Sequence, residues 1–479
     1  MIRSTLFLLV AAGFLMPLNA TARPAGPPSA GHPGKTHDLP AIRSSHVLRV
    51  LVNQSRNSSG EVKGQPIGVE YPRLAALEKY LNNQGPAKAG KVHIKVIPKA
   101  KEQLFAALQR GEGDLMAPGE LMDAAPPPSI VASAPLQGEA PLVLVGQKGA
   151  RHLARVEQLS GHSVALASGS AAGDAIDALN RRLAQHHQAP VKIEWVDPSL
   201  AAEDVLEMVQ AGIYPQTVVE RPIAERWLKV MPRLRVDARV AFPGPARLNW
   251  YVRSDAPQLQ GGLEQFLQSY KAPADGDANF KRAYAGLYQV HDPLKQADRQ
   301  RLEELRPVLQ RNAREQRMDW LDLAALAFKE SALDSAARGG SGATGLMQMT
   351  PAAAQRVGVS NIQNLDNNVQ ASARYLALIR QKFFASRAIN ERERMAFVIA
   401  AYNMGPERVQ AMRAEARKRG LNPNQWFFQV ERIAMEQVGM NAVNYVTSVN
   451  KYYLAYNRER DSLEPQSRRV AWVDTATGP

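Results

Sequence analysis

The chain has 479 residues, of which 45% are hydrophobic and 22% charged, a composition typical of soluble globular domains. Its length predicts roughly two to four domains. The formal net charge of +14 favours an anionic partner, but no Arg/Lys-rich recognition helix, zinc finger or aromatic-basic platform supports nucleic acid. With no cysteine, the chain has no disulfide framework and no lipid-modified N-terminal Cys.

The first 45 residues predict an export signal followed by a linker. In residues 1–22, Arg3 supplies a positive charge, residues 6–15 an apolar run and residues 20–22 a small-x-small cleavage pattern. The apolar run is too short to span a bilayer. Residues 23–45 are rich in Pro, Gly, Ser and His, which predicts a flexible linker. We therefore expect a periplasmic protein that is at most peripherally attached to a membrane.

From residue 46 onward, the pattern alternates between strands and helices. Strands are predicted at residues 47–52, 92–97, 114–117, 141–146, 159–166, 191–196 and 247–253, and helices at 71–81, 102–110, 173–186 and 203–210. Such alternation predicts an α/β domain with a largely parallel sheet. A second lobe is predicted to begin near residue 159, so we expect residues 46–291 to form one two-lobed domain.

Three stretches of this half resemble the extracellular solute-binding proteins of the amino-acid-binding type: residues 64–71, 104–115 and 159–161. The resemblance implies a two-lobed, periplasmic-binding-protein-like domain. That family usually carries an Arg after the third strand, which binds the carboxylate of an amino acid, but residues 120–128 contain none. We therefore expect no tight binding of free amino acids; a muropeptide, a wall peptide or no ligand at all remains open.

The second half of the chain predicts helices throughout. Residues 291–318 carry mixed charges, typical of a solvated helix face, and Pro307 is expected to break or kink that helix. Further helices are predicted at residues 369–384, 394–402, 425–435 and 443–456, the second of them apolar nearly all round and hence buried. We expect a mainly α domain at residues 300–457 and a disordered tail at residues 458–479.

Residues 319–331 predict a helix with one apolar face, formed by Trp320, Leu323, Ala324, Ala327 and Phe328. Glu330 lies at its end, just ahead of the Gly-rich residues 338–342. A carboxyl on the rim of an apolar helix is partly desolvated, which raises its pKa and suits a general acid near neutral pH. On position alone, an ordinary solvated residue at a helix end is the alternative.

Four motifs follow one another over this half: Glu330-Ser331, Gly-Leu-Met-Gln at 345–348, Ala-Tyr-Asn at 401–403, and Tyr445. In this order and spacing, they resemble the lytic transglycosylase family with a goose-lysozyme-like catalytic domain. The resemblance implies a lysozyme-like fold, with Glu330 as the catalytic residue. It also implies a groove lined by Ser331, Gln348, Tyr402, Asn403 and Tyr445. Asn403 fits a helix C-terminal cap before Gly405 equally well.

The resemblance further implies cleavage of peptidoglycan glycan strands between N-acetylmuramic acid and N-acetylglucosamine, leaving 1,6-anhydro ends. Ordinary glycoside hydrolysis requires two flanking carboxylates, and the motif segments offer none beside Glu330. Asp334 and Asp366 are the nearest alternatives, and both are interpreted as loop or cap residues. A goose-type lysozyme-like hydrolase and a sensor protein with an inactive catalytic half remain alternatives. No motif for a metal, a phosphate or a dinucleotide is present, so no cofactor is predicted.

Overall fold

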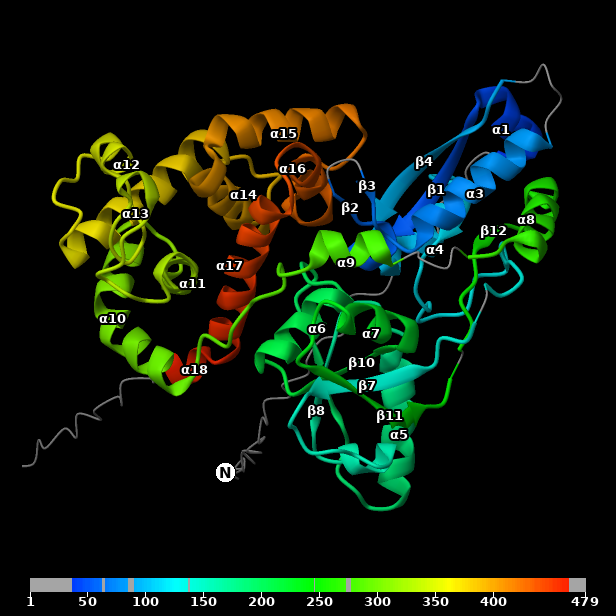
Figure 1. Ribbon diagram of the computed structural model, residues 1–479, viewed down its shortest axis with the longest axis horizontal. Coiled ribbons are helices and arrows are strands. Elements are labelled where there is room, and N and C mark those ends of the chain that lie inside the picture. Colours follow the sequence, from blue (N-terminus) through cyan, green and yellow to red (C-terminus); the bar gives the residue numbers. More distant parts are fainter. Residues whose placement is uncertain are drawn as a thin grey trace, which may run out of the picture.

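The computed structural model describes residues 37–62, 65–84, 90–136, 138–244, 246–272 and 277–464. The predicted signal peptide, most of the predicted linker and residues 465–479 of the predicted tail lie outside this part. Two α/β lobes and one helical domain lie side by side (Figure 1). In the described part of the chain, no helix is both long and apolar enough to cross a membrane.

The first lobe is built on a five-stranded sheet with the order β4-β1-β5-β12-β6. Its strands are β1 (Val47–Asn53), β4 (His93–Lys99), β5 (Leu115–Ala117), β6 (Ile130–Ala132) and β12 (Tyr251–Arg253), with a hairpin of β2 (Glu61–Val62) and β3 (Gln65–Pro66). Its helices are α1 (Leu39–Ser45), α2 (Arg56–Ser59), α3 (Glu70–Asn83), η1 (Lys101–Gln103), α4 (Leu104–Gln109) and α8 (Pro257–Ser269).

The second lobe is built on another five-stranded sheet, with the order β11-β7-β10-β8-β9. Its strands are β7 (Leu142–Gln147), β8 (Ser163–Leu166), β9 (Lys192–Trp195), β10 (Gln216–Glu220) and β11 (Leu234–Phe242). Its helices are η2 (Val156–Leu159), α5 (Ala172–Gln185), α6 (Ala202–Ala211) and α7 (Arg221–Leu228); α9 (Ala278–Tyr284) follows the return to the first lobe.

Both sheets are mixed, so the prediction of a largely parallel sheet was wrong. In the first lobe β1 pairs in parallel with β4 and β5, whereas β12 pairs antiparallel with β5 and β6. In the second lobe β8 is parallel to β9 and β10, whereas β7 is antiparallel to β10 and β11. The antiparallel pairs involve the strands at which the chain passes between the lobes. There the chain enters a sheet without the crossover helix that parallel pairing requires.

The span predicted as a linker ends in a helix, α1. The Asp38 carboxylate caps it by accepting a hydrogen bond from the backbone N–H of Leu39 at 2.7 Å, and it also accepts one from Leu259 of α8 at 2.8 Å. Ile42 is fully buried in the core of the first lobe. The burial of Ile42 and the two hydrogen bonds to Asp38 thus fix the end of a span that composition alone predicts to be flexible.

The helical domain contains α10 (Gln296–Glu315), α11 (Trp320–Ser331), η3 (Gly340–Gly342), α12 (Pro351–Arg356), α13 (Leu365–Phe383), α14 (Glu391–Met404), α15 (Pro406–Lys418), η4 (Trp426–Val430), α16 (Glu431–Gln437), α17 (Met440–Arg458) and α18 (Arg460–Leu463). Residues 395–401 of α14 are all buried, as predicted for a central helix. The first residues of the predicted tail, 458–464, are instead the end of α17 followed by α18.

Two helices of this domain differ from the sequence prediction. Helix α10 is not broken at Pro307, and Leu305, Val308 and Leu309 are buried on either side of that residue. Residues 425–435 do not form one helix: η4 is a single π-helical turn in which Phe428 adopts a φ of 63°. The Glu393 carboxylate imposes this turn, since it accepts the backbone N–H groups of Trp426 at 2.6 Å and Phe427 at 3.2 Å.

A network of buried charged side chains joins the three bodies of the fold, which are the first lobe, the second lobe and the helical domain. Arg56 of the first lobe donates to Asp204 of the second lobe at 3.0 Å and to Glu431 of the helical domain at 3.3 Å. Lys451 of α17 donates to Asp204 at 2.6 Å and to Glu207. All five side chains are at most 4% exposed. Because charges leave water only when they are paired, this network specifies how the three bodies dock.

Candidate active site

Glu330 lies in the last turn of α11. The helix begins at Asp319, whose carboxylate accepts the backbone N–H of Leu321 at 3.1 Å. It ends because Ala332 and Leu333 adopt φ values of 51° and 64°, a left-handed conformation that residues other than glycine seldom take. Residues 320–328 are all buried, so α11 is enclosed on every side rather than on the one face that its pattern predicts. Glu330 therefore lies where a buried helix reaches the surface.

The Glu330 carboxyl is half-buried and accepts a hydrogen bond from the hydroxyl of Tyr445, which lies on α17. Burial raises the pKa of Glu330, while the Tyr445 hydrogen bond and the charge of Lys329 lower it by less. A carboxyl with a raised pKa keeps its proton closer to neutral pH, as a general acid must. Of the predicted groove residues, Tyr445 is the one whose side chain bonds to Glu330 in the described part of the chain.

The Gly-Leu-Met-Gln segment is held by side chains from two helices. The Ser331 hydroxyl of α11 donates to the carbonyl of Leu346 at 2.8 Å, and the Tyr402 hydroxyl of α14 donates to that of Met347 at 2.8 Å. Gln348 donates to the carbonyl of Gly345 at 2.9 Å. These hydroxyl and amide groups thus position the loop beside Glu330. Their predicted contacts with a glycan stay a prediction.

Asn368 of α13 organises the same loop, and the sequence analysis missed it. The side chain is 1% exposed. Its amide oxygen accepts a hydrogen bond from the backbone N–H of Met347 at 2.9 Å. Its amide nitrogen donates to the backbone carbonyls of Thr344 at 2.8 Å and Ile362 at 2.9 Å. Gly345 lies against it with a φ of 75°, and a Cβ there would approach the Asn368 amide to 2.6 Å. No signal in the sequence pointed to this role, because Asn368 precedes the helix predicted at residues 369–384 and its burial appears only in the folded chain.

Asp334 and Asp366 are engaged away from Glu330. Asp334 accepts the backbone N–H of Ala336 at 2.9 Å, as expected of a loop residue. Asp366 lies in the first turn of α13, where Asn312 donates to it at 3.0 Å; the cap of that helix is Asn364. In the part of the chain that the structure describes, no second carboxyl is among the groups that shift the pKa of Glu330.

A cavity of about 780 Å³ borders this site through Lys329 and Tyr445. Asn403, which the sequence also predicts to lie in the groove, lines this cavity as well. The segment of residues 286–291, which leads from the first half of the chain into α10, also lines the cavity. The candidate active site is therefore bounded by both halves of the chain.

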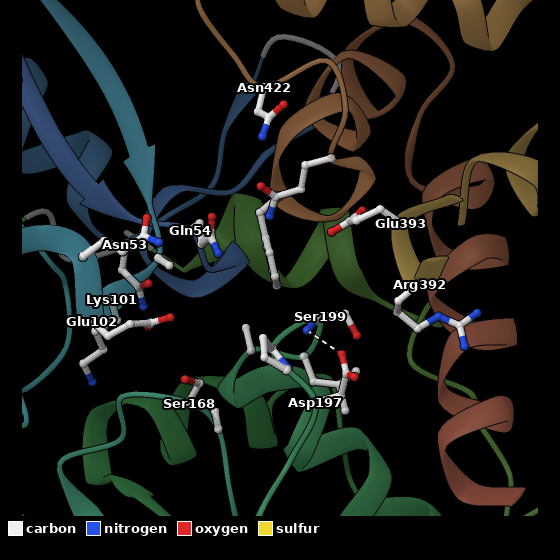
Figure 2. Close-up of a pocket in the computed structure, with 18 of the residues that line it drawn as sticks. Asn53, Gln54, Lys101, Glu102, Ser168, Asp197, Ser199, Arg392, Glu393 and Asn422 are labelled. Carbon is white, nitrogen blue, oxygen red and sulfur yellow. Dashed lines mark hydrogen bonds between the residues drawn. The ribbon is translucent and has the colours of Figure 1, made fainter. Parts of the chain in front are cut away.

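A second cavity, of about 460 Å³, lies where the two lobes meet the helical domain (Figure 2). After β5, in the stretch that lacks the carboxylate-binding Arg usual in solute-binding proteins, Glu120 pairs with Lys101 at 3.4 Å and accepts a hydrogen bond from the Ser55 hydroxyl at 2.9 Å. On the opposite wall, Arg392 donates to Asp322 of α11 at 3.1 Å. One lining residue of this cavity thus contacts the helix that carries Glu330. Polar residues from both lobes and the helical domain line it: Asn53, Gln54, Lys101, Asp197, Ser199, Arg392, Glu393 and Asn422. The guanidinium of Arg392 points away from the cavity (Figure 2).

Comparison with known proteins gives a family match in the helical half and relatives along most of the chain. Residues 307–425 match the Transglycosylase SLT domain. The chain is 27% identical over 401 residues to a membrane-bound lytic murein transglycosylase F from Desulfosudis oleivorans, covering 80% of this chain and 81% of that protein. It is 26% identical over 479 residues to a protein of the same name from Salmonella choleraesuis, covering 93% and 87%.

Among solved structures, an amino acid ABC transporter substrate-binding protein from Streptococcus pneumoniae, bound to L-arginine, is similar with a TM-score of 0.40 at 17% identity. The match covers 51% of this chain and 98% of that protein. In this chain, two α/β lobes precede the helical domain that holds Glu330. Over most of its length the chain is similar to the membrane-bound lytic murein transglycosylases F, and its helical half carries a Transglycosylase SLT domain.

Proposed function

We propose that this protein is a peptidoglycan lytic transglycosylase with a ligand-sensing N-terminal domain. It cleaves the β-1,4 bond between N-acetylmuramic acid and N-acetylglucosamine without water and leaves 1,6-anhydro ends. The observation that carries the proposal is a single half-buried carboxyl, Glu330, at the end of α11 in a domain related to lytic murein transglycosylases. We further propose a periplasmic location, peripheral to a membrane at most.

Glu330 serves both steps of the reaction. As an acid it protonates the glycosidic oxygen, so that the bond from that oxygen to C1 of the muramyl residue breaks. As a base it then takes the proton of the muramyl 6-hydroxyl while the 6-oxygen bonds to C1, which closes the anhydro ring and restores the carboxyl. Burial favours the acid form needed first, and the Tyr445 hydroxyl stabilises the carboxylate formed next. Because the nucleophile belongs to the substrate, no second carboxylate is required.

The identity of the product tests this function. The purified protein is incubated with peptidoglycan sacculi, and the released muropeptides are analysed by mass spectrometry. We expect ends that lack the water a hydrolase adds. If reducing-end muramic acid is the main product, the protein is a hydrolase with a further carboxylate. If sacculi stay intact under conditions in which the folded protein binds them, the sensor alternative holds.

A Tyr445→Phe variant is expected to move the alkaline limb of the pH–rate profile to higher pH. The Tyr445 hydrogen bond favours the charged form of Glu330 and so lowers its pKa. Its removal raises that pKa, and the acid form of Glu330 then persists at higher pH. Rates on sacculi measured across pH values give the limb directly, with Tyr80→Phe in the first lobe as the matched control. A limb that stays in place or moves to lower pH would contradict the assignment.

The sensing role of the first domain is supported by the position of the second cavity. Its walls come from both lobes and from the helical domain, and Arg392 connects it to α11 through Asp322. The polar, amide-rich lining suits a peptide or a muropeptide, whose groups donate and accept many hydrogen bonds. Glu120 stands where a free amino acid would need a cation for its carboxylate.

A further inference from the structure

The cavity beside Glu330 is cationic. Lys329, His291 and Arg408 line it together with the amides of Gln289 and Asn403. None of the residues that line it is acidic. Its volume of about 780 Å³ falls in the range of pockets that hold small ligands. The lining thus favours an anionic ligand that also accepts and donates hydrogen bonds.

Two of these cations have no acidic partner of their own. Among the described residues, neither Lys329 nor Arg408 forms an ion pair. The Lys329 ammonium, on a half-buried side chain, lies 5.8 Å from the centre of the Tyr445 ring. Burial lowers the pKa of Lys329, while the charges of Glu330 and Glu207 act in the opposite direction by less. A bound anion would add a partner within ion-pair distance.

The segment of residues 286–291 that lines the cavity is held by hydrogen bonds from both halves of the chain. Asn444 of α17 donates to the carbonyl of Leu287 at 2.7 Å, and Gln210 of α6 donates to that of Tyr288 at 3.3 Å. Glu207 accepts the backbone N–H of Val290 at 2.9 Å. Tyr288 and Val290 are buried, whereas the residues after each of them, Gln289 and His291, are exposed and line the cavity. The segment that connects the two halves is therefore built as a wall with polar side chains.

We propose that this cavity is a subsite for the carboxylates of a peptide stem, and that residues 286–291 complete it. The inference rests on the proposed function. In a stem-bearing glycan strand, the lactyl carboxyl of the muramyl residue is consumed in the amide bond to the peptide. The remaining anionic groups of such a strand are then the stem carboxylates. A strand whose scissile bond lies at Glu330 would present its stem to the cations beside Lys329.

The test compares stem-bearing strands with strands from which an amidase has removed the stems, using the full chain. In Arg408→Gln, we expect kcat/KM on stem-bearing strands to fall roughly tenfold relative to the value on stem-free strands, as for one lost charge-assisted contact. His291→Leu removes a hydrogen-bonding ring from the lining and should lower the same ratio. Arg417→Gln, an exposed residue on the same helix as Arg408, is the matched control and should leave that ratio as it is.

The stem-free strands separate two sources of carboxylate, because their lactyl carboxyls are free. An equal fall on both substrates would overturn the stem assignment, since the cations would then act on the lactyl group or on the strand as a whole. Unchanged kcat/KM values on both substrates in both variants would overturn the subsite. Anhydro ends formed by the unmodified protein on both substrates report separately on the proposed function, so the two failures are distinguishable.

Discussion

A Glu330→Gln variant is expected to fold and to lose nearly all turnover of peptidoglycan. Gln keeps the shape of the side chain and can still bond to the Tyr445 hydroxyl, but it has no proton to give to the glycosidic oxygen. Positioned acid–base catalysis contributes roughly 10²–10⁴-fold to a rate. Because one carboxyl serves both steps here, we expect a loss at the upper end of that range. The measurement is the initial rate of release of anhydro-muropeptides from sacculi.

The control for this variant is Glu315→Gln, which removes an exposed carboxyl from the end of α10. Its rate should equal that of the unmodified protein. Circular dichroism and binding to sacculi show whether Glu330→Gln is folded and still engages substrate. A folded Glu330→Gln variant that lyses sacculi at a near-normal rate would remove Glu330 from the mechanism.

A Lys451→Met variant is expected to lower the free energy of unfolding by about 3–5 kcal/mol, the usual cost of removing one partner of a buried ion pair. Lys451 is fully buried, and its ammonium bonds to Asp204 and Glu207 of the second lobe. Although burial alone would lower it, these two carboxylates raise the pKa of Lys451. Met fills a similar volume but leaves Glu207 buried without the ammonium.

The urea midpoint measures this loss, with Lys418→Met as the control because Lys418 is 77% exposed and lies 3.8 Å from its partner Glu415. Since Lys451 joins the helical domain to the second lobe, we also expect the variant to undock before either half unfolds. Limited proteolysis should then cut between residues 286 and 296 faster than in the unmodified protein. An unchanged midpoint together with unchanged cleavage would show that the network does not hold the halves together.

The sequence by itself determined most of the secondary structure and the order of the parts. Strand and helix periodicities identified β1, β4, α3, α5 and α14 nearly to their ends, because those patterns depend on which side of an element is buried. The position of Glu330 at the end of an apolar helix was likewise a local property. The loop role of Asp334 was local as well, since its carboxylate accepts the backbone N–H of Ala336.

The tertiary structure alone decided which groups meet. Tyr445 is 115 residues from Glu330 and reaches it because α17 packs against α11. Ser331 and Tyr402 turn out to bond to a loop backbone, and Asn368 completes that arrangement from a third helix. Periodicity reports that a face is buried but not what covers it. For that reason the partners of Arg56 and Lys451, and the wall formed by residues 286–291, could only come from the folded chain.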